Sequence, residues 1–196
     1  NAILSIAPYY NKPTQEGLYQ HYKTIAQSVE IPFMLYNVPG RTAVDLAPET
    51  AIKLFDDVKN IYGIKEATGS LERATAIMSQ REDFMVFSGD DGIDFPMLVS
   101  GAKGIISVTS NLVPDLKVKL VNSIFNKDYE TALKIHNDLY ELNKVLFCES
   151  NPIPIKTAMY LAGLLDSLEF RLPLTAPGKE TIEKLEKILK KYEGVK

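Results

Sequence analysis

The sequence is poor in the residue types that build disulfide frameworks and metal centres. It has one cysteine, Cys148, and two histidines, His21 and His136, among 196 residues. A single cysteine excludes an intrachain disulfide framework and fits a reducing compartment, so we expect a cytoplasmic protein with Cys148 as a small buried residue of a helix. The histidines lie far apart, and no His/Cys cluster with metal-ligand spacing can be drawn.

Positive charge and long apolar runs are also scarce. Lysine and arginine number 22 against 25 acidic residues, which gives a formal net charge of −3 and lacks the basic excess of nucleic-acid-binding proteins. No apolar run is long enough to cross a membrane, and no signal-peptide pattern opens the chain. The pattern of the first residues already predicts a buried strand, so we expect an N-terminal part of the protein to precede this sequence.

What the sequence does contain is a regular alternation of strand and helix patterns. The apolar strand candidates are Ile3–Ala7, Phe33–Val38, Ile61–Ala67, Phe84–Ser88 and Gly104–Thr109. Helical periodicity follows each of them, in Gln15–Val29, Pro48–Asp56, Leu71–Gln80, Ile93–Val99 and Pro114–Phe125. Alternation of this kind predicts an α/β fold with parallel strands that are covered on both faces.

Two architectures are compatible with such units: an open, doubly wound sheet, or part of an eight-unit (β/α)8 barrel. The segment after the first strand is no Gly-rich phosphate loop, which disfavours the doubly wound sheet. We therefore expect a TIM barrel of which this chain carries about the last five units, with residues 1–128 in the barrel. From Tyr129 to residue 196 the pattern is helical only, in Tyr129–Cys148, Pro154–Leu164 and Glu180–Tyr192.

Lys65 is the most informative residue, because it lies in an otherwise apolar strand. Strand alternation places Ile61, Gly63, Lys65 and Ala67 on one face, so small neighbours leave room for a ligand beside the amine. Desolvation lowers a lysine pKa and makes the amine a nucleophile that forms a Schiff base with a carbonyl compound. The alternative is a structural lysine whose stem is buried and whose ammonium reaches water.

Further polar residues stand at the carboxyl ends of the strands, where barrels carry their chemistry. Tyr36 shares a strand face with Met34 and Val38, and opposite a buried lysine it can relay protons. Arg41 follows the same strand and suits bidentate binding of a carboxylate. We interpret Asp90 and Asp91 as turn and cap residues rather than metal ligands.

At these strand ends the sequence closely resembles the dihydrodipicolinate synthases, which belong to the pyruvate-dependent class I aldolases together with N-acetylneuraminate lyase. The matching strings are Pro8-Tyr9-Tyr10, Tyr36-Asn37-Val38-Pro39-Gly40-Arg41-Thr42, Gly63-Ile64-Lys65-Glu66-Ala67-Thr68-Gly69, Ser88-Gly89-Asp90-Asp91, Asn151-Pro152-Ile153-Pro154-Ile155-Lys156 and Arg171-Leu172-Pro173-Leu174. They occur in the family's order and spacing along the whole chain.

The resemblance implies a lyase that condenses pyruvate with L-aspartate 4-semialdehyde in lysine and diaminopimelate biosynthesis. Lys65 would form the Schiff base and Tyr36 would relay protons, while Tyr10 would complete the relay in a neighbouring subunit's site. The resemblance also implies roles for the following residues: Arg41 binds the carboxylate of the semialdehyde, Gly89 and Ile106 line the pocket, and Tyr9 lies at a subunit interface near the feedback inhibitor lysine.

Family members bind no metal or organic cofactor and typically form homotetramers, so we expect the same here. The family's relay also uses a threonine from a Gly-Thr-Thr segment that this sequence lacks, together with most of the lysine-inhibitor pocket. Within the same chemistry the alternatives are an N-acetylneuraminate lyase or a keto-deoxy sugar acid aldolase. From another class, the alternative is a non-catalytic α/β binding module or an inactive barrel fragment.

Overall fold

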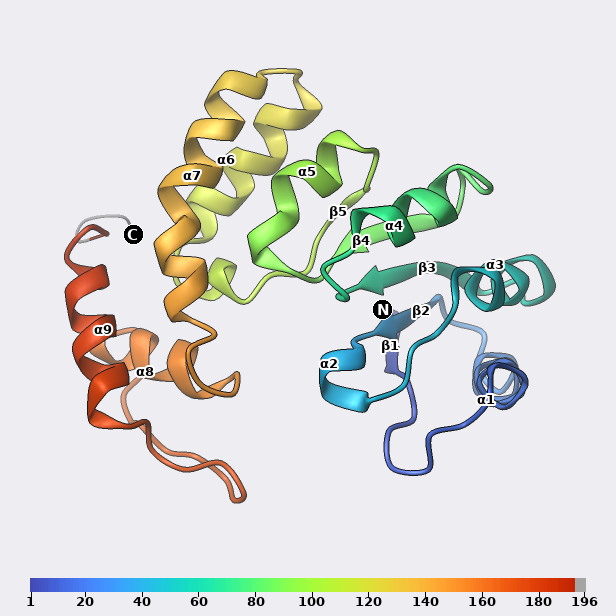
Figure 1. Cartoon of the computed structure of the whole chain (residues 1–196), viewed down its shortest axis with the longest axis horizontal. Helices are drawn as coiled ribbons and strands as arrows, with labels where there is room; N and C mark the ends of the chain where they lie inside the picture. The colour runs from blue at the N-terminus through green and yellow to red at the C-terminus, as the bar shows by residue number, and fades with distance from the viewer. Residues whose placement is uncertain (193–196) are drawn as a thin grey trace. The chain divides into compact units, whose positions relative to one another are not determined.

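The computed structural model describes residues 1–192 of the chain (Figure 1). Packing divides the chain into two compact units, one from Asn1 to Ile106 and one that begins at Ser107. The first unit holds the β-sheet and the second is helical. The predicted boundary between residues 128 and 129, which separates the barrel part from the C-terminal helical region, stays a prediction.

The first unit is built on a parallel sheet of five strands. The strands are β1 (Ile3–Ile6), β2 (Phe33–Asn37), β3 (Ile61–Glu66), β4 (Met85–Ser88) and β5 (Gly104–Ile105). They lie side by side in the order in which they occur along the chain. A doubly wound sheet reverses its order at a switch point, whereas a barrel does not, so this order favours the barrel.

Helices join the strands of this unit, and two of these α-helices begin at residues whose side chains cap them. They are α1 (Gln15–Gln27), α2 (Pro39–Thr42), α3 (Pro48–Asp57), α4 (Leu71–Met78) and α5 (Asp94–Val99), with a short 3₁₀ helix, η1 (Asp91–Ile93). The side chains of Thr14 and Ser70 accept hydrogen bonds from first-turn N–H groups of α1 and α4. Helix α2 was not predicted, since the first helix expected after this strand began at Pro48.

Strands β1 to β4 match their predicted ranges to within one residue at one end, but two larger differences occur. Strand β5 ends at Ile105 rather than at Thr109, because Ser107 and Ser110 bond each other's backbone and side-chain groups and begin the 3₁₀ helix η2 (Thr109–Asn111). The β2–β3 register shifts between Phe33 and Met34, so that Ile61 pairs with Phe33 and is out of phase with Lys65. The prediction that Ile61 shares the face of Lys65 was therefore wrong.

The second unit consists of helices α6 (Pro114–Phe125), α7 (Tyr129–Val145), α8 (Ile153–Leu161) and α9 (Lys179–Leu189) after η2. Helix α6 packs on α7, and α9 packs on both α7 and α8. Helix α7 ends before Cys148, and this cysteine is exposed rather than buried as predicted. None of the helices in the described part of the chain has the length and apolarity to span a membrane.

Candidate active site

Lys65 and Tyr36 lie next to each other on neighbouring strands. They are register partners in the β2–β3 pair, which places their side chains on one face of the sheet. The Lys65 Nζ atom lies 4.2 Å from the centre of the Tyr36 ring. Both side chains are only partly buried, so the amine is accessible to a small molecule. The predicted pairing of lysine and tyrosine is thus present within one unit.

The electrostatic environment favours the neutral form of the Lys65 amine. Burial lowers the pKa of Lys65; the carboxylate of Asp91 partly raises it, and the guanidinium of Arg41 lowers it further. Burial also raises the pKa of the Tyr36 phenol, against a smaller lowering effect of Arg41. At neutral pH the tyrosine therefore keeps its proton, while the lysine gives up its proton more readily than an exposed lysine does.

Gly89 provides the space that the Lys65 side chain occupies. A Cβ atom at Gly89 would lie 2.8 Å from Lys65 Cε, 3.0 Å from Lys65 Cγ and 2.8 Å from the Cβ atom of Ala67. The Gly89 N–H donates to the Glu66 carbonyl at 2.8 Å, which fixes this backbone against the strand of the lysine. The close approach requires glycine at this position.

Arg41 lies in α2, directly after the strand of Tyr36. The helix begins with Pro39, and Ala43 at its C-terminal cap takes a left-handed conformation with φ 53°. This single turn places an exposed arginine near enough to Lys65 and Tyr36 to affect both pKa values. Ile106 follows β5, and its N–H donates to the Ser88 carbonyl at 2.8 Å, next to Gly89.

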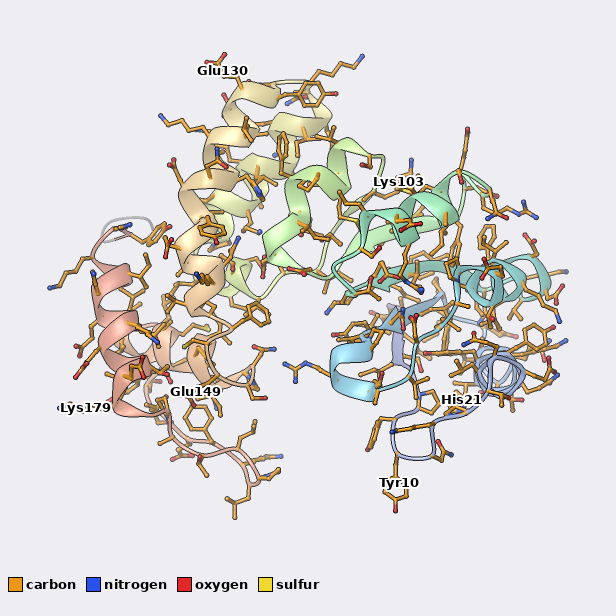
Figure 2. All side chains as sticks on the ribbon, in the orientation of Figure 1. Tyr10, His21, Lys103, Glu130, Glu149 and Lys179 are labelled. Carbon is orange, nitrogen blue, oxygen red and sulfur yellow. The ribbon has the colours of Figure 1, made fainter. Side chains whose placement is uncertain are left out.

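Tyr9 and Tyr10 belong to the loop between β1 and α1, and both are exposed. The Tyr10 side chain is 94% exposed and projects away from the rest of the unit (Figure 2). Tyr9 is 64% exposed. The first unit thus brings together Lys65, Tyr36, Arg41 and Gly89 but not the two tyrosines, whose predicted roles depend on a neighbouring subunit.

Asp91 is a site residue that the sequence analysis missed. Asp90 is the turn residue that was predicted, since its carboxylate accepts from the Gly92 N–H at 2.9 Å. Asp91 itself is buried and is the negative group that acts on the Lys65 amine. The sequence held no signal for this role, because a turn aspartate is most often solvated and its burial follows only from the tertiary structure.

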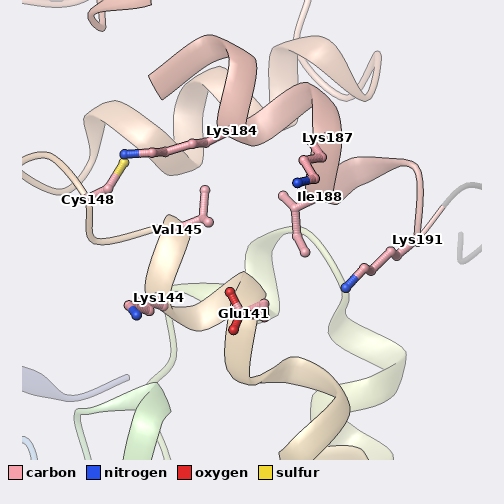
Figure 3. A pocket seen from close by; sticks show the side chains of 8 residues that line it. All are labelled: Glu141, Lys144, Val145, Cys148, Lys184, Lys187, Ile188 and Lys191. Atoms are coloured by element: carbon pink, nitrogen blue, oxygen red, sulfur yellow. The ribbon is translucent and has the colours of Figure 1, made fainter. Parts of the chain in front are cut away.

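A separate cavity lies in the second unit, between α7 and α9 (Figure 3). It has a volume of about 600 Å³ and is lined by Glu141, Lys144, Val145, Cys148, Lys184, Lys187, Ile188 and Lys191. Its lysines are exposed, and Lys184 pairs with Glu180 at 2.7 Å. Within residues 1–192, no group of three or more His, Cys, Asp or Glu residues could hold a metal ion.

Comparison with known proteins gives a match along nearly the whole chain. The model of the dihydrodipicolinate synthetase family matches residues 1–192. The 4-hydroxy-tetrahydrodipicolinate synthase of Aliarcobacter butzleri is 79% identical over 196 residues, which are 100% of this chain and 66% of that protein. The chain therefore spans just under two thirds of the length of this curated relative.

Solved structures show the same likeness. The chloride-inhibited dihydrodipicolinate synthase of Acinetobacter baumannii, complexed with pyruvate, superimposes with a TM-score of 0.92 at 47% identity, over 96% of this chain and 65% of that one. The Cyanidioschyzon merolae enzyme with lysine bound gives a TM-score of 0.91 at 36% identity, over 95% and 63% of the two chains. These matches confirm the prediction that the chain carries part of a (β/α)8 barrel.

Proposed function

The chain belongs to the dihydrodipicolinate synthetase family, and we propose that it carries the Schiff-base centre of a 4-hydroxy-tetrahydrodipicolinate synthase. This lyase condenses pyruvate with L-aspartate 4-semialdehyde in lysine and diaminopimelate biosynthesis. The observation that carries the proposal is the Lys65 amine, which lies 4.2 Å from the Tyr36 ring centre with a pKa lowered by burial. A neutral amine on a rigid strand is the group that this chemistry needs.

In the proposed reaction the lone pair of Lys65 Nζ attacks the keto carbon of pyruvate, and water leaves to give an iminium. The iminium withdraws electrons, so a proton is lost from the methyl group and an enamine forms. The enamine carbon then attacks the aldehyde carbon of the semialdehyde. Finally the amino group of the added chain attacks the former keto carbon, which closes the ring and expels Lys65 as a free amine.

Tyr36 is the proposed proton donor and acceptor for these steps. Its raised pKa keeps the phenol protonated at neutral pH, so it can give a proton to the departing water and recover one later. Tyr10 is proposed to extend this relay from a neighbouring subunit, which fits a side chain that is 94% exposed in its own chain. The remaining member of the family's relay, a threonine, does not occur in a Gly-Thr-Thr segment here.

Arg41 is proposed to bind the carboxylate of the semialdehyde. An exposed guanidinium close to the amine can pair bidentately with a small acid without displacing Tyr36. Gly89 and Ile106 are proposed to line the pyruvate side of the pocket. Gly89 does so by leaving space for the Lys65 stem, and Ile106 by its place beside the Ser88–Gly89 backbone.

The assembly, regulation and location of the protein are also proposals. We propose a homotetramer in which Tyr9 and Tyr10 lie at a subunit interface, because isolated exposed tyrosines gain stability when a partner covers them. Inhibition by lysine, at a pocket near Tyr9, is proposed from the family resemblance and from the relative with lysine bound. The single cysteine fits the cytoplasm.

A comparison of substrates tests the proposed function. The protein, produced at the full length of its relatives, is assayed with pyruvate plus aspartate semialdehyde and, separately, for cleavage of N-acetylneuraminate and of keto-deoxy sugar acids. We expect efficient turnover of aspartate semialdehyde alone, because Arg41 suits a short acid rather than a polyhydroxy chain. Equal or faster cleavage of the sugar acids would overturn the assignment.

A further inference from the structure

A network of polar groups lies behind the strands that carry Lys65 and Tyr36; its Asn37 and Glu66 side chains are buried, and its Asp45 side chain is 52% exposed. We name it the Arg73 network, and its members are Asn37, Asp45, Leu46, Glu66 and Arg73. Arg73 comes from α4, while Asn37 and Glu66 are the residues that directly follow Tyr36 and Lys65. Asn37 and Glu66 are themselves register partners across the β2–β3 pair.

Arg73 connects both strands at once. Its Nε atom lies 3.7 Å from Glu66 Oε2, and its Nη1 group pairs with Asp45 Oδ2 at 3.0 Å. Its Nη2 group donates to the Leu46 carbonyl. The guanidinium thus lies against the end of β3 through Glu66 and against the segment between α2 and α3 through Asp45 and Leu46.

Asn37 continues these connections to β2. Its amide donates to Asp45 Oδ1 at 2.9 Å, and its side-chain oxygen accepts from the Leu46 N–H at 3.1 Å. The Glu66 carboxylate is 1% exposed and accepts from the Thr68 N–H at 2.9 Å. Every member of the Arg73 network therefore makes a hydrogen bond or an ion pair with another member or with the backbone that follows a strand.

Alternation of side chains links this network to the amine. Residues that follow one another along a strand point to opposite faces, so any shift of Asn37 or Glu66 displaces Tyr36 or Lys65 on the other face. The Glu66 carboxylate is 1% exposed, and a buried carboxylate is stable only while its charged and hydrogen-bonding partners stay in place. Loss of a partner would therefore destabilise this part of the sheet.

We propose that Arg73 is a positioning residue that sets the distance between the Lys65 amine and Tyr36, a role that rests on the proposed Schiff-base function. It does not contact the substrate. It holds the ends of β2 and β3 in register from behind, so that the tyrosine hydroxyl can serve the amine throughout the reaction. Glu66 is its ion-pair partner on the lysine strand, at 3.7 Å and without a hydrogen bond between the two atoms, and the Asp45–Asn37 pair connects it to the tyrosine strand.

The test uses the conservative substitution Arg73→Lys in the full-length protein. Lysine keeps the charge, but its single amine cannot reach Glu66, Asp45 and the Leu46 carbonyl together. We expect kcat to fall about tenfold while KM for pyruvate stays within about twofold, since misplacement of a catalytic group by a fraction of an ångström slows chemistry rather than binding. Asp45→Asn keeps the bond to Asn37 through Oδ1 and should cause a smaller loss of kcat. This variant is the one to measure if Arg73→Lys does not fold.

The matched control is Arg81→Lys. Arg81 also bonds an aspartate, with two contacts of 2.7 Å to Asp56, but its side chain is 42% exposed and its third bond goes to the Gln80 carbonyl rather than to a strand. We expect kcat of this variant to be unchanged. Equal losses in Arg73→Lys and Arg81→Lys would overturn the proposal.

A double-substitution cycle separates positioning from general stability. If Arg73 acts by placing Tyr36, then Arg73→Lys should cause no further loss of kcat in a protein that already carries Tyr36→Phe. A loss that multiplies fully with that of Tyr36→Phe would show a merely structural role and overturn the proposal. A wild-type protein that neither condenses the substrates nor traps pyruvate would overturn the proposed function itself, which is a different result.

Discussion

Replacing Gly89 by alanine would add a methyl group where the Lys65 side chain now lies. The new Cβ would approach Lys65 Cε and Ala67 Cβ to 2.8 Å each and Lys65 Cγ to 3.0 Å. The end of a lysine side chain can move, but the Cβ of Ala67 is fixed to the strand. The substitution therefore forces either the Lys65 stem or the backbone after β4 to shift.

The size of the effect follows from these contacts. Overpacking of a well-packed site costs about 1–3 kcal/mol in the free energy of unfolding, which corresponds to a melting temperature lower by about 2–10 °C. The effect on chemistry is larger, because an amine displaced by about 1 Å from its working position loses about 100-fold in rate. We expect this loss in the rate at which pyruvate forms its adduct with Lys65.

The assay combines thermal unfolding with single-turnover trapping by borohydride. The control is Gly40→Ala, since a Cβ atom at Gly40 meets no atom within 4 Å and the residue lies in the turn of α2. This control should keep the wild-type trapping rate and unfold at the same or a slightly higher temperature. If the Gly89→Ala variant traps pyruvate at the wild-type rate and unfolds at the wild-type temperature, the reasoning that Gly89 makes room for the lysine is refuted.

Two further predictions concern Tyr36 and Lys65. Tyr36→Phe keeps the ring beside the amine but removes the hydroxyl. Pyruvate should still be trapped on Lys65, at a lower rate, while kcat for the condensation falls about 100- to 10,000-fold. Unchanged turnover would exclude Tyr36 as a proton relay. Lys65→Met should raise the free energy of unfolding at pH 7, because the folded state must otherwise hold a partly buried charge. Since the pKa of Lys65 is lower in the folded state, wild-type stability rises with pH from that lowered pKa up to the ordinary lysine pKa, so the advantage of Lys65→Met in urea unfolding should shrink at pH 10. An advantage that stays constant or grows with pH would contradict this assignment.

Much of the fold was predictable because the strands are continuous apolar segments and the helices carry clear starts. Thr14 and Ser70 are the N-caps of α1 and α4, and Pro48 and Pro114 are the first residues of α3 and α6. The end of β5 was not predictable from apolarity, because the backbone and side-chain bonds between Ser107 and Ser110 end the strand early. Local hydrogen bonding of serines competes with strand pairing, and the pattern of apolar residues gives no information on such bonds.

The candidate site was likewise predictable in part from the sequence. Lys65 and Tyr36 were identified because one buried amine and one tyrosine stood out at the ends of apolar strands, and the register then places them together. Asp91 and Arg73 were missed because their roles depend on contacts between elements far apart in the sequence. A turn aspartate and a helix arginine have common solvated alternatives, and only tertiary structure separates those alternatives from the buried arrangement.

The central claim is that Lys65 is the amine that forms the Schiff base. Its most direct test is to treat the full-length protein with pyruvate and borohydride and to locate the reduced adduct by mass spectrometry of peptides, with Lys65→Arg as the matched control. We predict one adduct, on Lys65, and none in the control, since the arginine keeps the positive charge but cannot form the imine. A folded protein that gains no mass, or an adduct that persists on another lysine in the control, would contradict the account.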